Sequence, residues 1–393
     1  MDTSSKRLND KEPMAKLLKI TKRRQEIIDT LFASIDDISN LSDEFILSIP
    51  CDIIHNMVDE ENTERIIDRV FNYYRRVGFP YYSQDDAVLL KEHKKFNKFD
   101  VNRLVLDNNE LNQAMLGLSF TNAFFPNMWS VRCKNQKTPM EVFNDDALLK
   151  LAIRKRIRMS DSKLAPFNIR KSIKLFSGAQ AVSGFRPTIA KCLVGLLFPN
   201  GEKISVLDPC MGWGGRMYGF SQSDQVEKYV GFDVATETVM GLWELRNKLR
   251  RLNLLNDTDI AIYQHPFEDA RDIVMEYTPF DLVMTSPPYF DIEKYSDDED
   301  QSYRKYATYT EWVDGFLKPS IILSHHALRS GGILALNVGY GELYDDTYAI
   351  IEEVFGSVET VYNMRLSRLC GKGVDKSVQK FKHEPIIIAR KET

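Results

Sequence analysis

One stretch decides the fold: residues 280–289, which read Phe280-Asp281-Leu282-Val283-Met284-Thr285-Ser286-Pro287-Pro288-Tyr289. Its apolar run, Leu282 to Met284, predicts a buried strand, because parallel strands covered on both faces are continuously hydrophobic. Two consecutive prolines then end the strand in a stiff, extended turn, since proline fixes φ and has no N–H. Ligands of open α/β sheets bind at the carboxyl ends of such strands, so this turn is a candidate site.

The turn carries groups that suit a planar amide or amine. Ser286 offers a hydroxyl, Tyr289 offers an aromatic face, and the stiff backbone holds free carbonyl groups in a fixed direction. A simpler interpretation is that the two prolines only terminate the strand. The turn taken alone does not decide between these two interpretations.

A glycine-rich turn lies upstream. Residues 204–208 predict a strand, and the following Pro209-Cys210-Met211-Gly212-Trp213-Gly214-Gly215-Arg216 predicts a turn that opens a helix. Glycine lets the backbone approach a ligand closely, and a helix N-terminus supplies free N–H groups. A second predicted strand ends in Asp233, 25 residues after Asp208. A carboxylate at that place is positioned to accept hydrogen bonds from ribose hydroxyls.

The spacing of the glycines limits the ligand. Gly212, Gly214 and Gly215 do not form the G-x-G-x-x-G fingerprint that binds a pyrophosphate. The sequence therefore predicts an adenosine-containing ligand without a diphosphate.

These two motifs carry a family resemblance. The segment Asp208 to Gly215 resembles the S-adenosylmethionine motif of class I methyltransferases, and Thr285 to Tyr289 resembles the catalytic motif of the DNA amino-methyltransferases. The serine form is more typical of cytosine-N4 enzymes, whereas adenine-N6 enzymes usually carry Asp or Asn. The resemblance covers roughly residues 166–393. It implies an α/β fold with a doubly wound, seven-stranded, mostly parallel, Rossmann-like sheet.

The resemblance also implies roles for individual residues. Ser286 Oγ and the Pro287 carbonyl would accept the N–H bonds of an exocyclic amine, while Tyr289 would stack on the base. The implied catalytic residues are Ser286, Pro287, Pro288 and Tyr289. The implied residues that bind S-adenosylmethionine are Phe185, Arg186, Pro187, Asp208, Pro209, Gly212, Gly214, Asp233, Glu268, Asp269 and Thr285. Glu268 and Asp269 are alternative partners of the adenine amino group, and either could instead stabilise a helix N-terminus.

Length and composition limit the number of domains and the classes of protein to which the chain could belong. A chain of 393 residues suffices for two domains, because single cores stop growing near ~250–300 residues. The five cysteines are scattered and never form Cys-x-x-Cys, so no zinc or other metal site is expected. No apolar run reaches the ~18 residues that span a membrane, and the N-terminus is polar. A cytoplasmic protein without membrane contact is therefore expected.

Residues 1–165 are predicted to form a mainly helical domain. Apolar spacing predicts helices over residues 14–32 and 63–77. The region holds 26 basic and 25 acidic residues, so a contact with a polyanion would need a local patch. Basic clusters over residues 91–98 and 154–158, and the aromatic and arginine-rich stretch 73–82, are candidates for contacts with a nucleic acid. They could equally be solvated faces and core packing.

The resemblance implies a methyl transfer to an exocyclic amino nitrogen of a DNA base, with cytosine N4 favoured over adenine N6. A base in duplex DNA would have to flip out. Residues 1–165 are the candidate recognition domain, residues 166–393 the methyltransferase domain, and the resemblance leaves room for a restriction enzyme as a partner. The acidic stretch 290–302, which has no periodicity, predicts a loop over the site. The oligomeric state is not predicted.

Two other functions stay open. An RNA guanine or adenine methyltransferase would share the proline-aromatic loop. A degenerate methyltransferase fold could serve as a binding subunit without activity. A C5-cytosine mechanism is disfavoured, because it needs a cysteine nucleophile in the catalytic loop, and the Pro209-Cys210 pair lies in the cofactor turn.

Overall fold

The computed structural model describes residues 22–133, 135–159, 162–176, 178–179, 182–368 and 381–392. The helix predicted over residues 14–32 is described from Lys22 onward as α2 (Lys22–Ala33), and its earlier part lies outside the described residues. Among the described residues, no helix is both long and apolar enough to cross a membrane.

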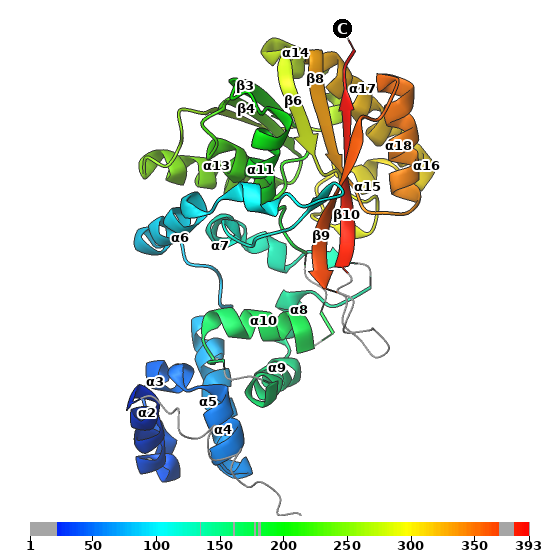
Figure 1. The fold of residues 1–393 in the computed structure, drawn as a ribbon. Helices are drawn as coiled ribbons and strands as arrows, with labels where there is room; N and C mark the ends of the chain where they lie inside the picture. Colours follow the sequence, from blue (N-terminus) through cyan, green and yellow to red (C-terminus); the bar gives the residue numbers. More distant parts are fainter. Residues whose placement is uncertain are drawn as a thin grey trace, which may run out of the picture. The chain divides into compact units, whose positions relative to one another are not determined.

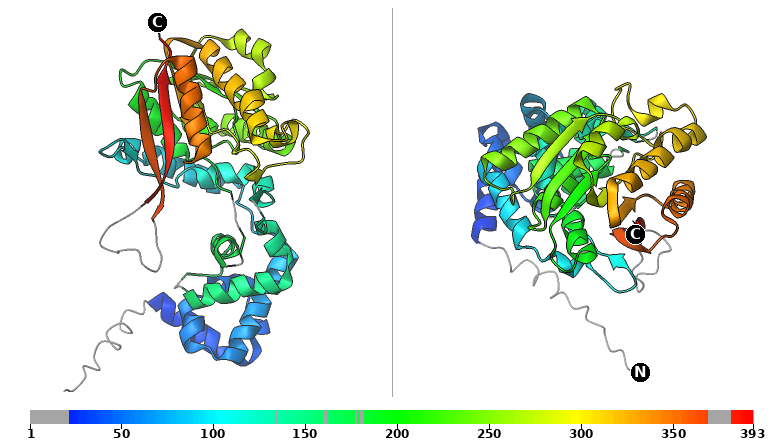
Figure 2. Two further views of the ribbon diagram at one scale, coloured as in Figure 1. Left: turned by 90° about the vertical axis from the view of Figure 1, so that its right-hand side faces the viewer. Right: turned by 90° about the horizontal axis from the view of Figure 1, so that it is seen from above.

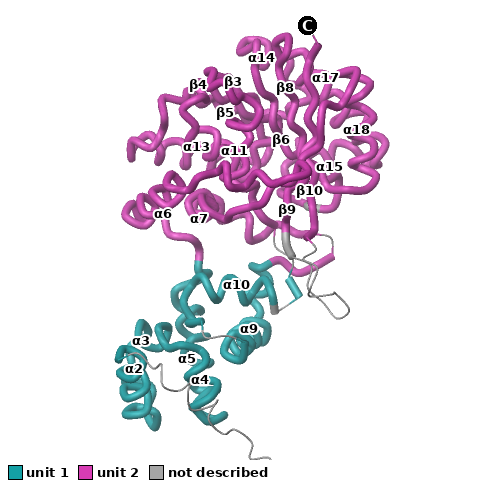
Figure 3. The backbone as a smooth tube through the Cα atoms, viewed as in Figure 1, with its two compact units in different colours: residues 1–80, 139–179 teal, residues 81–138, 180–393 magenta. Residues whose placement is uncertain are grey.

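The chain divides into two compact units (Figure 3). Unit 1 comprises residues 1–80 and 139–179, and unit 2 comprises residues 81–138 and 180–393. The sequence predicted one boundary at residue 165, whereas residues 81–138 group with the C-terminal part of the chain. Whether residues 1–165 recognise a target stays a prediction.

Unit 1 is helical where it is described. Its longest helix, α5, begins at the cap Asp59, whose side chain accepts a hydrogen bond from the backbone N–H of Asn62, and it ends at Gly78, which has a φ of 86°. The helices of unit 1 are α2, α3 (Asp43–Ser48), α4 (Cys51–Met57), α5 (Glu60–Val77), α8 (Pro139–Asn144), α9 (Asp146–Met159) and α10 (Pro166–Phe176).

Some of the aromatic and basic side chains of unit 1 have partners within the unit. The hydroxyl of Tyr74 is buried and donates to the Leu164 carbonyl oxygen over 3.0 Å. Arg154 forms an ion pair with Glu64 at 2.5 Å. These side chains stabilise the fold of unit 1, and a contact between this region and nucleic acid stays a prediction.

Unit 2 is built on one large sheet (Figure 1). Among the described residues, this sheet has eight strands in the order β1-β9-β10-β8-β6-β3-β4-β5, and all neighbouring pairs are parallel except those that include β10. The strands are β1 (Glu110–Leu111), β3 (Ile204–Asp208), β4 (Val226–Asp233), β5 (Asp259–Gln264), β6 (Phe280–Thr285), β8 (Leu328–Asn337), β9 (Thr360–Arg368) and β10 (Phe381–Arg390).

The predicted fold class, a doubly wound and mostly parallel α/β sheet with a mainly helical N-terminal part, is confirmed. The predicted number of seven strands was wrong by one. The additional strand, β1, is two residues long and pairs with β9 at the edge of the sheet. A segment of that length is too short to leave a periodic pattern in the sequence.

Helices cover both faces of this sheet (Figure 2). Val230 and Phe232 of β4 belong to an apolar core that they share with residues of α14, α17 and α18. Tyr229, beside Val230, points to the opposite face, and its ring lies 6.1 Å from that of Phe220 on α12. The larger helices of unit 2 are α6 (Asp86–Lys98), α11 (Pro187–Leu197), α12 (Gly215–Ser221), α13 (Thr236–Arg251), α14 (Arg271–Tyr277), α17 (Lys318–Ala327) and α18 (Glu342–Phe355).

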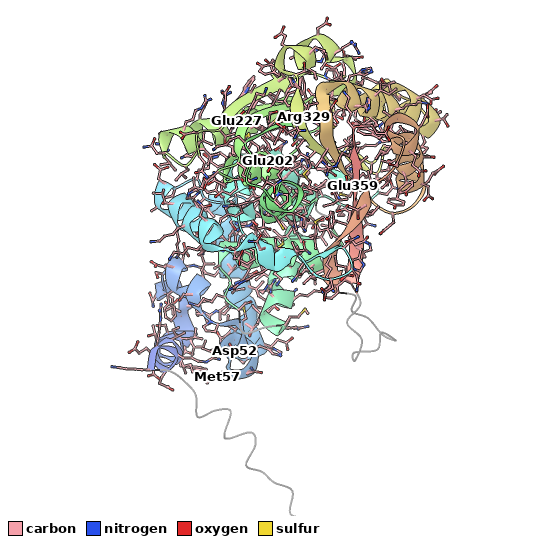
Figure 4. All side chains as sticks on the ribbon, turned by 45° about the horizontal axis from the view of Figure 1, so that its top comes forward. Asp52, Met57, Glu202, Glu227, Arg329 and Glu359 are labelled. Atoms are coloured by element: carbon pink, nitrogen blue, oxygen red, sulfur yellow. The ribbon has the colours of Figure 1, made fainter. Side chains whose placement is uncertain are left out.

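The amino and carboxyl ends of the parallel strands carry different kinds of residues. At the amino end of β6, Asp281 accepts hydrogen bonds from Arg329 over 2.5 Å and from the backbone N–H of Ser205 over 2.8 Å (Arg329 is labelled in Figure 4). Structural contacts therefore occupy this end. The carboxyl ends of β3, β4 and β6 carry the two motifs that the sequence singled out.

Residues 81–138 are an integral layer of unit 2. Besides supplying β1, they pack against α13 at Gly241, where an added Cβ would lie 2.5 Å from the Phe124 carbonyl oxygen and 2.8 Å from the Phe125 ring. Only glycine permits this close approach of the two segments.

We expect Gly241→Ala to destabilise unit 2 by about 1–3 kcal/mol, because the added methyl group overpacks the contact with Phe124 and Phe125. Gly195→Ala on α11 is the matched control. The nearest atom to its Cβ would be 4.0 Å away, so the gain in helix propensity should stabilise the protein by up to about 1 kcal/mol. Urea unfolding measures the change in the free energy of unfolding of both variants. A stabilised Gly241→Ala variant would contradict the close contact of Gly241 with Phe124 and Phe125.

Candidate functional site

A cavity of about 220 Å³ lies at the carboxyl ends of the parallel strands, within unit 2. The structure brings many of the predicted site residues together on its wall. These are Phe185, Arg186, Pro209, Gly212, Asp233, Glu268, Ser286, Pro287, Pro288 and Tyr289. Five others are not among the residues that line it: Pro187, Asp208, Gly214, Asp269 and Thr285.

The glycine turn takes its shape from the left-handed conformation of two glycines. Gly212 has a φ of 55°, and Gly214, which precedes α12, has a φ of 67°. Residues with a Cβ rarely adopt these values. The turn therefore brings its backbone up to the cavity.

Asp233 connects the second strand to this turn. Its carboxylate accepts a hydrogen bond from the Gly212 N–H over 2.8 Å and another from the Ala235 N–H over 3.0 Å. Burial raises the pKa of Asp233 to about 6, although both hydrogen bonds favour the ionised form. This acid faces the cavity and can still accept hydrogen bonds, because each carboxylate oxygen has a second lone pair.

Asp208 lies behind the cavity and is fully buried. It accepts two hydrogen bonds from Arg216, over 2.8 and 3.1 Å, and one from the Tyr229 hydroxyl over 2.6 Å. The hydroxyl of Thr285 also donates to Asp208 over 3.0 Å, and it accepts the Cys210 N–H over 3.0 Å. Thr285 and Asp208 therefore join the strand end at β6 to the glycine turn after β3.

The proline turn presents its residues to the same cavity. Ser286 makes no side-chain hydrogen bond to the residues that the structure describes, and Pro287 and Pro288 line the wall beside it. Tyr289 donates its hydroxyl to Glu384 on β10 over 2.5 Å. The next residue, Phe290, has a φ of 49°, which is unusual for a bulky side chain and indicates local strain beside the site.

Glu268 and Asp269, the two alternative acids, differ in position. Glu268 lines the cavity and forms an ion pair with Lys305 at 2.7 Å. Burial raises the pKa of Glu268, and Lys305 opposes this shift. Asp269 binds the same lysine at 2.8 Å, but its side chain is exposed and is not among the lining residues. Of these two acids, Glu268 is therefore the one that lies on the cavity wall.

The stretch 290–302 lies beside the cavity, as the predicted loop would require. Its Tyr295 lines the wall and contacts the Trp213 ring at 5.6 Å between centroids. Asp298 fastens the loop to the start of α13 by accepting the Thr236 N–H over 3.1 Å and its hydroxyl over 3.0 Å.

Sequence reasoning missed several lining residues. Asn337, Met364 and Glu384 come from β8, β9 and β10, at least 48 residues after the proline turn. The sequence carries no local signal for them, because the strand order of the folded sheet brings them to the cavity. Trp213 could have been found, since it lies inside the glycine turn.

The cavity combines acids with aromatic rings. Asp233 and Glu268 are acidic, and the rings of Phe185, Trp213 and Tyr289 form parts of the wall. The wall also carries Arg186 and Arg216, of which Arg216 is paired with the buried Asp208. Such a lining suits a cationic ligand that contains a flat ring. Among the residues that the structure describes, no group of three or more His, Cys, Asp or Glu is placed to hold a metal ion.

The chain was compared with family models, curated proteins and solved structures. No family model matches the chain, and no curated protein matches it in sequence. Precorrin 8w decarboxylase from Methanobacterium thermoautotrophicum is 14% identical over 53% of this chain and 92% of its own, with a TM-score of 0.35. A 16S rRNA N2 methyltransferase from T. thermophilus, solved with AdoMet and guanosine, is 16% identical over 55% of this chain, with a TM-score of 0.34.

A SAM-dependent O-methyltransferase from Thermotoga maritima is similarly distant, with 11% identity over 54% of this chain and 68% of its own and a TM-score of 0.35. The chain spans about half of the rRNA methyltransferase, 46% of that chain. Likenesses at these scores carry no argument about the ligand or the substrate of this chain.

We expect Asp208→Ala to lower the free energy of unfolding by about 3–5 kcal/mol, because it leaves the buried Arg216 guanidinium without its partner. Glu353→Ala is the control. It breaks an ion pair with Lys318 that is largely exposed, and such pairs contribute about 0–1 kcal/mol. Urea unfolding of both variants tests the difference, and equal losses would show that Asp208 is not a structural centre.

Proposed function

We propose that this chain transfers a methyl group from S-adenosylmethionine to an exocyclic amino nitrogen of a DNA base, with cytosine N4 favoured over adenine N6. One observation carries the proposal. The Ser286-Pro287-Pro288-Tyr289 turn and the Gly212 and Asp233 region face one cavity at the carboxyl ends of adjacent strands. A transfer reaction needs this arrangement, because donor and acceptor must meet in line.

The lining residues fit the proposed cofactor. Asp233 would accept the ribose hydroxyls, as expected for an acid at the end of the second strand. Glu268 would accept the adenine amino group, and the backbone at Gly212 allows close approach. Carboxylates also favour a ligand that carries a sulfonium and an ammonium charge.

When bound, S-adenosylmethionine supplies an electrophilic methyl group on a sulfonium, and the thioether leaves with the C–S bonding pair as the new N–C bond forms. The residues of this chain prepare the amine. Ser286 Oγ and the Pro287 carbonyl would accept its N–H bonds, so that the nitrogen lone pair turns out of the ring plane toward the methyl carbon. Tyr289 would stack on the base. After transfer the methylated nitrogen is positively charged, and it would release its proton to water.

DNA is the proposed partner, with the target base flipped out of a duplex at a cost of a few kcal/mol. Residues 1–165 are the proposed source of target recognition, and a restriction enzyme is a compatible partner. The direct test is methyl transfer from radiolabelled S-adenosylmethionine to unmodified duplex DNA, followed by nucleoside analysis. Labelled N4-methylcytosine supports the proposal, and N6-methyladenine corrects the base. A label in RNA alone, or bound cofactor without transfer, would replace it with one of the two alternatives.

We expect Ser286→Ala to lower kcat by roughly 10²-fold, because one of the two acceptors that turn the amine is lost. Tyr289→Ala should abolish transfer. Both variants should bind S-adenosylmethionine normally, which isothermal titration calorimetry measures. If either variant also loses the cofactor, that residue serves the cofactor site or the fold, and its assignment to the amine fails.

We expect affinity for S-adenosylmethionine to fall as the pH drops from 7 to 5. Burial raises the pKa of Asp233 to about 6, so the carboxylate that accepts the ribose hydroxyls is ionised above this pH and gains a proton below it. Titrations at several pH values should show the loss of one ionised group. Asp233→Asn should bind weakly with little dependence on pH, and an unchanged profile in that variant would remove Asp233 from the cofactor site.

A further inference from the structure

Two contacts with described residues position the Tyr289 side chain. Its hydroxyl donates to Glu384 Oε1 over 2.5 Å, across 95 residues of sequence. Its ring lies against Gly339, just after β8, where an added Cβ would be 3.3 Å from the ring carbon Cε2. Together, the hydrogen bond at the hydroxyl and the close approach along the ring edge restrict the torsions of the side chain.

Glu384 is itself on a rigid element. It pairs with Met364 on β9, and both residues line the cavity. The following Pro385 restricts Glu384 to an extended conformation. The Pro385 carbonyl accepts hydrogen bonds from Asn337 Nδ2 over 2.9 Å and from the Val338 N–H over 3.2 Å. These bonds tie this part of β10 to the end of β8.

Arg186 is a positively charged group near this carboxylate. The negative charge of Glu384 favours the protonated form of the Arg186 guanidinium. Arg186 donates hydrogen bonds to Gln113 over 2.9 Å and to the Ser183 hydroxyl over 2.9 Å, which hold its side chain in place. A hydrogen bond from a hydroxyl to a carboxylate is stronger than one to a neutral acceptor.

We infer that Glu384 is a positioning residue that fixes the Tyr289 ring as the platform for the target base. The inference rests on the proposed function, and nothing in the proline turn itself supplies the second anchor. Without Glu384, the Tyr289 hydroxyl would lose this acceptor, and the ring would sample a wider range of side-chain torsions. A misplacement of about 1 Å at a reacting group can lower a rate by about 10²-fold.

Four variants test the inference: Glu384→Ala, Glu384→Gln, Tyr289→Phe and the double variant Glu384→Ala/Tyr289→Phe. Glu384→Ala should lower kcat by about 10–10²-fold and leave the cofactor Kd within about twofold. Glu384→Gln keeps an acceptor oxygen and should recover much of the rate. Because Glu384 acts through the hydroxyl, the double variant should be no slower than the slower single variant. Additive losses would overturn the inference.

A second measurement needs no methyl transfer. Tyrosine labelled with ¹³C at Cζ reports on the hydroxyl, and Tyr289→Phe assigns the Tyr289 signal. The signal should move in Glu384→Ala and stay near its place in Glu384→Gln. Gly339→Ala, which pushes on the ring edge and spares the carboxylate, should move it in a different way.

The two measurements separate the two proposals. If the ¹³C signal of Tyr289 does not move in Glu384→Ala, the positioning role of Glu384 is overturned, whatever the methyltransferase activity of the variant. A signal that moves as expected in a protein that methylates no nucleic acid supports the positioning of Tyr289 and rejects the proposed reaction.

Discussion

The fold of the candidate site depends on the buried carboxylate of Asp208. Taking a charge out of water is costly, and Asp208 is stable there because Arg216, Tyr229 and Thr285 all donate to it. These donors come from α12, β4 and β6. One carboxylate therefore fixes the relative positions of two strand ends and of the helix that follows the glycine turn.

Within the two motifs, the residues that stabilise the fold differ from the residues that line the cavity. Asp208 and Thr285 belong to the two motifs, yet neither lines the cavity, whereas Gly212 and Ser286 do. Thr285 precedes the proline turn directly, so its hydrogen bond to Asp208 sets where that turn leaves the sheet. Asp208 and Thr285, which make several buried hydrogen bonds, therefore fix the backbone, whereas their neighbours in sequence line the cavity.

Much of this was predictable from sequence, for identifiable reasons. The apolar runs that form β3 and β6 and the proline and glycine turns after them are local signals, and the structure has strands and turns at those places. Glu384 gave no such signal, because its partner Tyr289 is 95 residues away. The grouping of residues 81–138 with unit 2 was missed for the same reason. Contacts such as that between Phe124 and Gly241 exist only in the folded chain.

The charges of the cavity limit how a nucleic acid could approach it. Asp233, Glu268 and Glu384 line the wall together with two cations, Arg186 and Arg216, and the charge of Arg216 is balanced by its ion pair with Asp208. Such a lining attracts a cationic cofactor but repels phosphate groups. For the proposed reaction, the part of the target that enters must therefore be uncharged.

A flipped base meets that requirement, because its ring is neutral and its phosphates stay outside on the backbone. The stretch 290–302 strengthens the constraint, since Asp300 adds another acid at the cavity. Phosphate contacts would then have to lie away from the cavity. The exposed lysines of α6, Lys91, Lys94, Lys95 and Lys98, belong to the same unit and offer charge of the required sign. Base flipping would thus reconcile an acidic site with a polyanionic substrate, because it admits the base and excludes the backbone.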